Sequence, residues 1–574
     1  MKTLDANIEK QPRTLLPENF TITTWDALQP YFEELQQRPV DNVAALEQWL
    51  KDVSELEAVI SEDACWRQIR MTCDTTDKVL EEAFTYFCME IEPKLRPYSD
   101  ALNKKLLASE WLRDLDQELY NTYLRSVRNQ VKLFREENVP LQAELSVMSQ
   151  QYGAIAGKMT ISVNGQEYTL QQAAKFLESS DRALREEVFG KNAARRLEDK
   201  TTLDNLYTKL VEKRDQVAKN AGFANYRDYK FEELKRFDYT KEDCFQFHAA
   251  IKEHIIPLVK TLQEKQRQKL GLEVLKPWDT EAEPAGVKPL EPFHTGEELV
   301  NKAIETFDKL GPFFGNCLRV MQQMGRLDLD SRKGKAPGGY NCPLAETGVP
   351  FIFMNAAGQM KDLTTMVHEG GHAVHSFLSH HLPLSAFKEY PMEIAEVASM
   401  SMELFTMDHW DIYFKDAEEL RRAKLQQLER SISIFPWIAT IDKFQHWVYE
   451  HPQHTVEERT TNWVNILNDF STSVVDWTGW ENYRAISWQR QLHLFEVPFY
   501  YIEYGIAQLG AIAMWKQYKE NKQQALDNYV KALSLGSTRT LPELYAAAGI
   551  RFDFSPAYVK ELATFVQQEI DKIS

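Results

Sequence analysis

Two histidines and a glutamate stand together in the stretch MVHEGGHAVHSF, residues 366–377. If this stretch is helical, His368 and His372 are one turn apart and both imidazoles leave the same face. Zinc accepts neutral imidazole nitrogen at about 2.0–2.1 Å, so two such side chains can reach one ion. In HExxH sites the glutamate, here Glu369, takes a proton from the attacking water and does not bind the metal. The spacing therefore predicts a catalytic zinc site.

Two histidines leave such a site incomplete, because a catalytic zinc usually has three protein ligands and one open position. The segment PMEIAEVASMSMELF offers Glu393, Glu396 and Glu403. Glu396 and Glu403 share a helix face, and Glu393 lies one turn before Glu396. Spacing alone leaves all three open. His375 also lies on the face of His372, and we interpret it as a packed or supporting histidine rather than a ligand.

Two adjacent glycines, Gly370 and Gly371, interrupt the predicted helix at its centre. Each costs about 1 kcal/mol relative to alanine in a helix interior. The absence of side chains lets another backbone approach, either that of a neighbouring helix or that of an extended substrate. We favour helix packing for at least one of the two. The helix itself is predicted over about 363–380, with Asp362 as its N-cap.

A second group of polar side chains lies in the segment HLFEVPFYYIEYGIAQLGA. Pro498 suits the first turn of a helix, on which Tyr501 and Tyr504 would be one turn apart. Aromatic residues in such a pattern usually belong to the core. Peptide hydrolysis, however, builds an oxyanion that needs a hydrogen-bond donor, and a tyrosine hydroxyl can supply one. His493 and Tyr500 belong to the same segment.

The remaining chain predicts the elements that must hold these residues. Amphipathic helical periodicity runs through 22–150 and again from about 171 to about 270. Between them, Asn164-Gly165 separates alternating strand-like residues and predicts a hairpin. The proline-rich and acidic stretch 275–298 predicts a long surface loop, and VPFIFMN, 349–355, a short buried strand. From residue 361 onward nearly everything is predicted to be helical, so the fold class is mostly α.

The composition of the chain argues against nucleic acid and membranes as partners. The formal net charge of −18 opposes nucleic-acid binding, because a phosphate backbone needs a basic surface. The six cysteines are scattered and none forms a CxxC pair, which argues against a disulfide framework or a cysteine zinc site. We find no run of eighteen apolar residues and no apolar segment of signal-peptide length at the N-terminus. These features predict no membrane span and a cytoplasmic location.

The sequence HEGGH, followed by a helix bearing AEVAS, resembles the thimet oligopeptidase and oligoendopeptidase F family of zinc metallopeptidases. Within that family the bacterial oligoendopeptidase F and Pz-peptidase are the most similar types. Glu396 follows His372 by 24 residues, about the distance at which the family places its third zinc ligand. The resemblance therefore implies Glu396 as the ligand and Glu403 as a partner of a zinc histidine. Glu393 is left as a solvated charge near the helix start.

The resemblance extends to the tyrosine segment, because family members carry a histidine followed by a tyrosine cluster there. It implies Tyr504 as the oxyanion donor, with Tyr501 and His493 as substrate binders or additional donors. The spacing from His493 to Tyr504 is one residue shorter than in the family, which leaves Tyr500 and Tyr501 both open. The segment GKAPGGYNCPLAETGVPFIFMN also resembles the family, and we expect its PFIFMN strand to bind an extended peptide by edge pairing.

The fold that the resemblance implies is a two-part helical ellipsoid with a deep substrate channel and a small β-sheet near the active site. We divide the chain into an N-terminal helical region, 1–170, and a zinc metallopeptidase catalytic region, 171–574. The expected function is that of an intracellular zinc oligoendopeptidase, with one zinc per chain, that cleaves internal bonds of short unstructured peptides. The alternatives are a zinc carboxypeptidase or peptidyl-dipeptidase, and a non-catalytic peptide-binding scaffold with a structural metal. The intact Glu369 argues against the scaffold.

Overall fold

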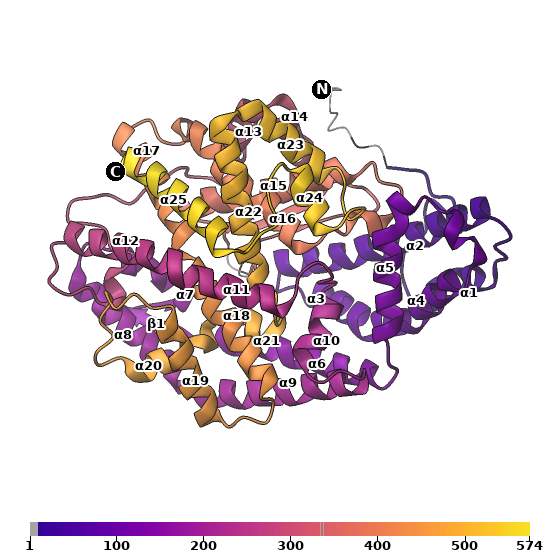
Figure 1. Ribbon diagram of the computed structural model, residues 1–574, viewed down its shortest axis with the longest axis horizontal. Coiled ribbons are helices and arrows are strands. Elements are labelled where there is room, and N and C mark those ends of the chain that lie inside the picture. Colours follow the sequence, from indigo (N-terminus) through magenta and orange to yellow (C-terminus); the bar gives the residue numbers. More distant parts are fainter. Residues whose placement is uncertain (1–7, 9, 333, 337) are drawn as a thin grey trace. The chain divides into compact units, whose positions relative to one another are not determined.

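The computed structural model describes residue 8 and residues 10–332, 334–336 and 338–574 (Figure 1). The chain forms two compact units, each built from separate segments. Unit 1 comprises the chain up to Phe134, Leu290–Lys424 and Ala507–Phe552, and unit 2 comprises Arg135–Pro289, Leu425–Ile506 and Asp553–Ser574. The chain is 69% helical, which confirms the mostly α class. The division at residues 170 and 171 stays a prediction.

Unit 1 contains two sets of helices. The first set is N-terminal: α1 (Trp25–Gln37), α2 (Val43–Cys73), α3 (Lys78–Tyr86), α4 (Glu92–Leu107) and α5 (Gln117–Leu133). The second set comes from later segments: α13 (Gly296–Leu310), α14 (Pro312–Gln323), α15 (Met360–Ser379), α16 (Met392–Phe405), α23 (Lys522–Leu533) and α24 (Leu541–Ala547). Helices α17 (Ala417–Ser433) and α22 (Tyr501–Glu520) each carry the chain from one unit into the other.

Unit 2 is built from helices of the middle and the end of the chain. They are α6 (Asn138–Ala156), α7 (Leu170–Ala173), α8 (Arg182–Glu198), α9 (Lys200–Asn220), α10 (Tyr226–Glu233), α11 (Lys241–Ala250), α12 (Ile256–Lys269), α18 (Phe435–Glu450), α19 (Val456–Asp469), α20 (Glu481–Ala485), α21 (Leu492–Glu496) and α25 (Pro556–Ile573). Among the helices of the described chain, none combines the length and apolar character that crossing a bilayer requires.

The predicted hairpin is confirmed in unit 2. Strand β1 (Thr160–Val163) pairs antiparallel with β2 (Gln166–Thr169). Asn164 and Gly165 have φ values of 53° and 80°, as a two-residue turn with positive φ at both positions requires. The loop predicted over 275–298 is largely irregular, but it is not purely a surface loop. Trp278 is buried in a cluster with Phe189 and Tyr483, and Arg182 and Arg185 bind the buried Asp279 carboxylate.

A small sheet lies beside α15 in unit 1, as expected for the region of the site. Strand β5 (Phe351–Ala356) pairs parallel with β3 (Leu327–Asp330) and antiparallel with β4 (Tyr340–Cys342), in the order β3-β5-β4. The buried strand expected at VPFIFMN is therefore present. The expected edge pairing of this strand with a peptide is wrong, because β5 is the central strand. The edges that β5 would have offered are occupied by β3 and β4.

The two glycines of α15 are both explained by packing. A Cβ on Gly371 would lie 2.6 Å from the Cα of Ser399 and 2.7 Å from the carbonyl oxygen of Ala398, both on α16. A Cβ on Gly370 would lie 2.7 Å from the ring of Phe307 on α13. Figure 1 shows α15 and α16 as neighbours in space. The lost helix propensity is offset by a backbone approach that no larger residue permits.

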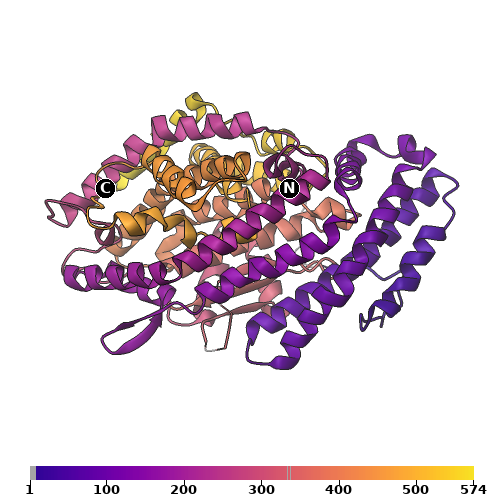
Figure 2. The ribbon, with the colours of Figure 1, turned by 90° about the horizontal axis from the view of Figure 1, so that it is seen from below.

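The N-terminal helices of unit 1 form a core of their own, which Figure 2 shows as an indigo and purple bundle. This core also takes in Phe387, from the short 3₁₀ turn Ser385–Lys388 between α15 and α16. The Phe387 ring packs edge-on against Tyr120 of α5, with 5.2 Å between ring centroids. The Ser385 backbone N–H donates to the Ser54 hydroxyl of α2. The N-terminal helices thus hold the connection between the two site helices.

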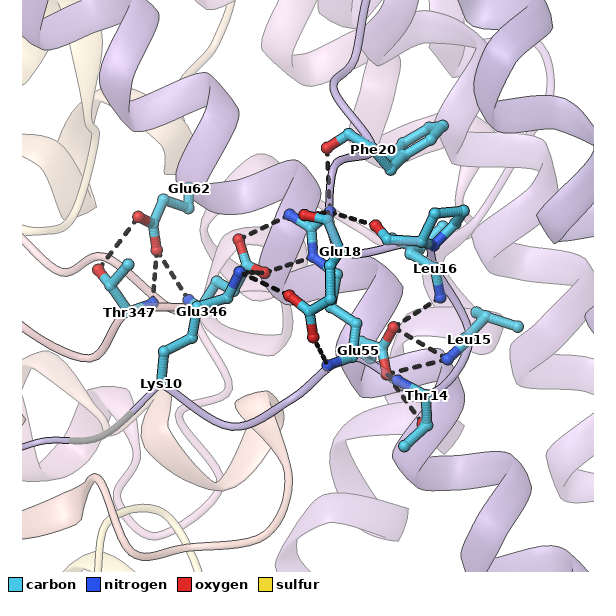
Figure 3. A network of polar contacts seen from close by, with 12 residues as sticks. Lys10, Thr14, Leu15, Leu16, Glu18, Phe20, Glu55, Glu62, Glu346 and Thr347 are labelled. Carbon is cyan, nitrogen blue, oxygen red and sulfur yellow. Dashed lines mark hydrogen bonds and ion pairs between the residues drawn. The ribbon is translucent and has the colours of Figure 1, made fainter.

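A polar network ties the same helices to the loop before β5 (Figure 3). The Glu62 carboxylate of α2 accepts hydrogen bonds from the backbone N–H groups of Glu346 and Thr347, at 3.0 and 2.7 Å. The Arg13 guanidinium binds the Glu346 carboxylate, with a closest distance of 2.6 Å. Glu55 accepts from the backbone of Thr14 and its two successors. Helix α2 therefore holds in place both the segment around Thr14 and the loop that precedes β5.

The packing of Gly371 makes a testable prediction. Gly371→Ala should lower the free energy of unfolding by about 1–3 kcal/mol, because the new methyl group meets backbone atoms of α16 that cannot rotate away. Thermal or urea unfolding followed by circular dichroism measures the effect.

The matched control is Gly153→Ala on α6, where a Cβ meets nothing nearer than Glu496 Oε1 at 3.9 Å. That exposed helix position should gain about 0.5–1 kcal/mol from the better propensity of alanine. A Gly371→Ala variant as stable as the wild type would contradict the close-packing explanation.

Candidate active site

Helix α15 carries the two histidines, and its start differs from the prediction. The N-cap is Gln359 rather than Asp362, which occupies the third helical position of a capping box. The Asp362 carboxylate accepts hydrogen bonds from the backbone N–H groups of Gln359 and Ala357, at 3.0 and 2.7 Å. The predicted N-cap lies three residues too late, because an acidic residue is common both at the N-cap and at the third position of a capping box. From this cap the helix runs regularly to Ser379.

The structure brings both histidines of α15 against one glutamate of α16. His368 Nε2 lies 3.3 Å from Glu396 Oε2, and His372 Nε2 lies 3.7 Å from the same oxygen. Each of the three residues offers one ligand atom, and these atoms lie within 4.8 Å of one another. The two imidazole rings are nearly perpendicular, at 84°. Local spacing left three glutamates open, and the packing of α16 on α15 brings Glu396 to the imidazoles.

Hydrogen bonds at the far side of each ligand fix its orientation. His368 Nδ1 donates to Glu403 Oε1 at 2.7 Å, and Glu403 lies about two turns after Glu396 on the same face of α16. The His372 ring is hydrogen-bonded to the backbone of Ala395. The Ser399 hydroxyl donates to Glu396 Oε2 at 3.0 Å. With Nδ1 of His368 engaged by Glu403, its Nε2 faces Glu396, and Nε2 of His372 faces the same Glu396 oxygen.

Burial and charge set the protonation of this cluster. Burial opposes a charged imidazole at His368, but Glu396 and Glu403 outweigh it and hold the His368 pKa well above its usual range. Burial also opposes ionisation of Glu396, yet the two histidines keep its pKa at about 2. Burial lowers the pKa of His372 to about 4. Without a metal, the His368 imidazole is therefore protonated beside the Glu396 and Glu403 carboxylates.

The donor set fits a zinc ion. Ligand atoms at about 2.0–2.1 Å from a tetrahedral zinc are separated from one another by roughly 3.3 Å. The distances of 3.3 and 3.7 Å between the imidazole nitrogens and Glu396 Oε2 are close to that value. Two imidazoles and one carboxylate, each oriented by a further hydrogen bond, form a ligand set typical of catalytic zinc. The set leaves a fourth position for a water molecule or a substrate.

Glu369 lies next to His368 and is not part of this donor set. Its side chain is buried, and burial raises the pKa of its carboxyl group to about 7. A carboxyl group in this range can both accept and return a proton near neutral pH. The Glu369 backbone carbonyl accepts a hydrogen bond from the Asn341 side chain of β4, at 3.3 Å. Strand β4 is thereby joined to the helix turn that carries Glu369.

Two neighbours of the site differ in their surroundings. His375 is fully buried, and its ring stacks on Tyr390 with 3.4 Å between ring centroids. It does not belong to the group of possible metal ligands, in agreement with its interpretation as a packed histidine.

Glu393 was expected to be a solvated charge, and this is wrong, because only 4% of it is exposed. Its position in the first turn of α16 faces inward rather than toward water.

The predicted histidine and tyrosines gather in unit 2. The His493 ring lies 4.9 Å from that of Tyr501 and 5.8 Å from that of Tyr504, measured between centroids. Tyr501 and Tyr504 are one turn apart at the start of α22, 5.5 Å from each other. Tyr500 also contacts His493, at 5.9 Å. The imidazole and the three phenols thus form one cluster, in the unit that does not contain the imidazole–carboxylate cluster.

The turn that precedes this cluster differs from the prediction. Pro498 lies in the connection between α21 and α22, not in the first turn of a helix, since α22 begins at Tyr501. Phe499 has a φ of 67°, unusual for a bulky residue, and its N–H donates to the Gln445 side chain at 2.6 Å. Its carbonyl accepts from Arg236. These contacts stabilise a reversal of the chain that local sequence did not indicate.

The groups of the cluster are suited to donate hydrogen bonds. Burial raises the pKa of Tyr501 to about 12, so its phenol stays protonated at neutral pH. The Gln491 amide nitrogen donates to His493 Nδ1 at 2.6 Å, which places the imidazole proton on Nε2. Both groups are therefore neutral donors. Because each donor carries its proton at neutral pH, it can form a hydrogen bond to an oxyanion.

Sequence reasoning missed the residues that only support others. Ser399 orients Glu396, and its place three residues later on the same helix is a signal that could have been used. Tyr529 of α23 donates to the carbonyl of Ala398 at 2.8 Å and so holds α16 where Gly371 meets it. Asn341 had no signal, because its contact with Glu369 crosses from a strand to a helix. Supporting residues of this kind follow from packing.

Comparison with known proteins decides the family. Residues 175–564 match peptidase family M3, and residues 17–134 match the peptidase M3 N-terminal domain. The chain belongs to peptidase family M3. The resemblance inferred from HEGGH and AEVAS is thereby confirmed. As a family M3 peptidase, the chain is a peptide hydrolase, and its matched segments include the imidazole–carboxylate and the tyrosine clusters.

Individual relatives of this family M3 peptidase are distant in sequence. It is 21% identical over 515 residues to an oligoendopeptidase F homolog of Borreliella burgdorferi, covering 86% of this chain and 84% of the relative. It is 22% identical over 424 residues to oligopeptidase PepF of Bacillus subtilis, covering 71% and 60%. The solved structure of Pz peptidase A with an inhibitor is 27% identical, covers 96% of this chain and 99% of that one, and superposes with a TM-score of 0.90.

The contact between His368 and Glu403 makes a second prediction. In protein kept with a chelator, Glu403→Gln should lower the pKa of His368, because an amide cannot offer the negative charge that favours the imidazolium. A raised folded-state pKa adds stability that is present below about pH 6.5 and is lost as pH rises through the folded pKa. The variant should therefore lose stability mainly on the acidic side.

Carbon-13 labelled histidine and a pH titration by NMR measure the change directly. Glu393→Gln, the same substitution on the same helix, serves as the control and should move the His368 titration less. An unchanged His368 titration in Glu403→Gln would contradict the assigned pairing.

Proposed function

We propose that this family M3 peptidase is a zinc-dependent oligoendopeptidase that hydrolyses internal bonds of short, unstructured peptides. The observation that carries the proposal is the convergence of His368, His372 and Glu396 on one point, with Glu403 behind His368. His368, His372 and Glu396 would hold one zinc ion per chain. A zinc ion bound there would polarise the scissile carbonyl and lower the pKa of the attacking water.

Glu369 moves the proton in this proposal. Its carboxylate accepts the proton of the attacking water and later delivers it to the nitrogen of the leaving amine. The buried position, with a pKa of about 7, supports this dual role, because neither protonation state is strongly preferred near neutral pH. Glu403 positions His368 by holding its Nδ1–H, which leaves Nε2 for the metal.

Tyr504 stabilises the oxyanion in this proposal, and Tyr501 and His493 bind the substrate or donate further hydrogen bonds. Their contacts with one another within unit 2 support a common role. A hydroxyl that meets the oxygen only when negative charge develops lowers the barrier without tightening substrate binding.

The substrate class rests on the relatives and on the sheet. Oligoendopeptidase F and oligopeptidase PepF are the names of the similar proteins, which supports oligopeptides as substrates here. Strand β4, rather than the central β5, is the edge strand on the α15 side to which an extended peptide could add by main-chain hydrogen bonds. A deep channel that excludes folded proteins and a cytoplasmic location belong to the same proposal. Mapping cleavage positions in a peptide mixture separates endopeptidase from carboxypeptidase or dipeptidase action.

Metal content tests the ligand assignment. Wild-type protein purified without added metal should hold zinc, and Glu396→Ala should weaken zinc binding by more than the ~10- to 100-fold typical of losing an outer partner of a ligand. Glu393→Ala is the matched control from the same helix and should leave zinc affinity unchanged. A larger loss in the Glu393 variant than in the Glu396 variant would reverse the assignment.

The base is tested by Glu369→Gln. The amide is nearly isosteric with the carboxylate but accepts no proton, so turnover should fall by ~100-fold or more while zinc and fold are kept. Glu393→Gln makes the same chemical change at another buried glutamate and should retain turnover. Steady-state hydrolysis of a quenched peptide and metal analysis give the two readouts. If Glu369→Gln kept more than about a tenth of wild-type turnover, Glu369 would not be the general base, because losing such a base typically costs ~100-fold or more.

The oxyanion donor is tested by Tyr504→Phe. Loss of one such donor typically reduces turnover by ~100- to 1,000-fold, with little change in substrate binding. The ring remains, so the melting temperature should hardly move. A residue of the core would give the reverse pattern, with near-normal turnover and a small loss of stability. Near-normal turnover would transfer the role to Tyr501 or His493, which Tyr501→Phe and His493→Gln then test.

A further inference from the structure

A second cluster of potential metal ligands lies in unit 2, in the interface between α11 and α18 (Figure 1). Cys244 and His248 are one turn apart on α11, and Asp442 and His446 are one turn apart on α18. Cys244, Asp442 and His446 each offer one ligand atom, and these atoms lie within 4.8 Å of one another. None of these residues belongs to the proposed active site.

The cluster is more deeply buried than the first one. The exposed fractions are 1% for Cys244, 0% for Asp442 and 2% for His446. The rings of Phe231, Phe245 and Phe499 surround the His446 imidazole, with centroid distances of 5.9, 4.9 and 5.4 Å. A buried carboxylate and a buried imidazole in an aromatic enclosure are costly to desolvate unless something binds their polar atoms.

The polar atoms in this enclosure are incompletely satisfied. His248 Nε2 donates to Asp442 Oδ2 at 2.9 Å, but Asp442 Oδ1 has no hydrogen-bond partner among the described residues. Both ring nitrogens of His446 are buried and likewise lack a hydrogen-bond partner within the described chain. His446 Nε2 nonetheless lies 3.2 Å from Asp442 Oδ2. A nitrogen and an oxygen at this separation, with Cys244 Sγ within 4.8 Å of both residues' ligand atoms, are spaced as ligands of one zinc ion would be.

We infer that Cys244, Asp442 and His446 bind a structural zinc ion that joins α11 to α18. Thiolate sulfur, imidazole nitrogen and carboxylate oxygen are all zinc ligands, and the thiolate disfavours calcium and magnesium, which require oxygen. One thiolate and one carboxylate balance the charge of a divalent ion. His248 holds the Asp442 carboxylate from behind, in the way that Glu403 holds His368.

The absence of a CxxC pair in the sequence argued against a cysteine zinc site. The three-dimensional arrangement reverses that conclusion, since the ligands come from two helices almost 200 positions apart, as the separation of 194 residues between His248 and Asp442 shows. Each helix contributes residues at a spacing of four, which places both on one face. The function of the site is to stabilise unit 2, because burial leaves no access for a substrate.

Metal counting on the full-length protein tests this inference. Plasma mass spectrometry should find about two zinc ions per wild-type chain, one in Cys244→Ser, one in Glu396→Ala and none in the double variant. Cys317→Ser, which removes an equally buried thiol in unit 1 outside any predicted ligand group, is the matched control and should keep both ions. One ion in the wild type and none in Glu396→Ala would overturn the inference.

Two further measurements guard against a variant that fails to fold. Cobalt(II) loaded into Glu396→Ala should give a near-ultraviolet thiolate-to-cobalt charge-transfer band, which the double variant lacks. Chelation should lower the melting temperature of Glu396→Ala but not that of the double variant. Absence of the band, or a melting temperature that chelation leaves unchanged, would overturn the site. If instead the proposed catalytic site held no zinc, Glu396→Ala would leave the count unchanged while Cys244→Ser still lowered it.

Discussion

The close approach of α15 and α16 at Gly371 is the constraint on which the candidate active site depends. A side chain there would collide with backbone atoms of Ala398 and Ser399, so only glycine permits the contact. The same contact brings Glu396, three residues before Ser399, within 3.3 Å of His368. Ser399 in turn orients the Glu396 carboxylate. One close approach of two helices thus sets both the packing and the geometry of the His368, His372 and Glu396 cluster.

The N-terminal helices carry no residue with an obvious chemical role, yet they hold the surroundings of this contact. Phe387, in the turn that connects α15 to α16, is buried in their core. Glu62 of α2 fixes the backbone of Glu346 and Thr347 before β5. Both contacts are made to segments that lead directly into site elements. A family in which the N-terminal domain accompanies the peptidase domain is consistent with this support.

The two imidazole–carboxylate clusters apply one local rule to different ends. In each, a helix presents two ligand-type residues four positions apart, and a second helix completes the set. At α15 and α16 the imidazoles are only half-buried, and an additional carboxyl group, that of Glu369, stands beside them. At α11 and α18 all three residues are buried, and phenylalanine rings surround His446. The two clusters therefore differ in their access to solvent, which a catalytic role would need and a structural role would not.

The sequence by itself determined the features that depend on local spacing: the helix of His368 and His372, the turn at Asn164-Gly165, the buried strand β5 and the mostly α class. Local spacing left three glutamates open, and the tertiary structure shows that Glu396 faces the imidazoles, as the family resemblance implied. Tertiary structure alone decided that β5 is central and that Glu393 is buried. It also brought Cys244 to His446, which no motif indicated. Periodicity and turn chemistry act within a few residues, whereas the partner across a helix interface depends on the register of two segments that sequence spacing does not encode.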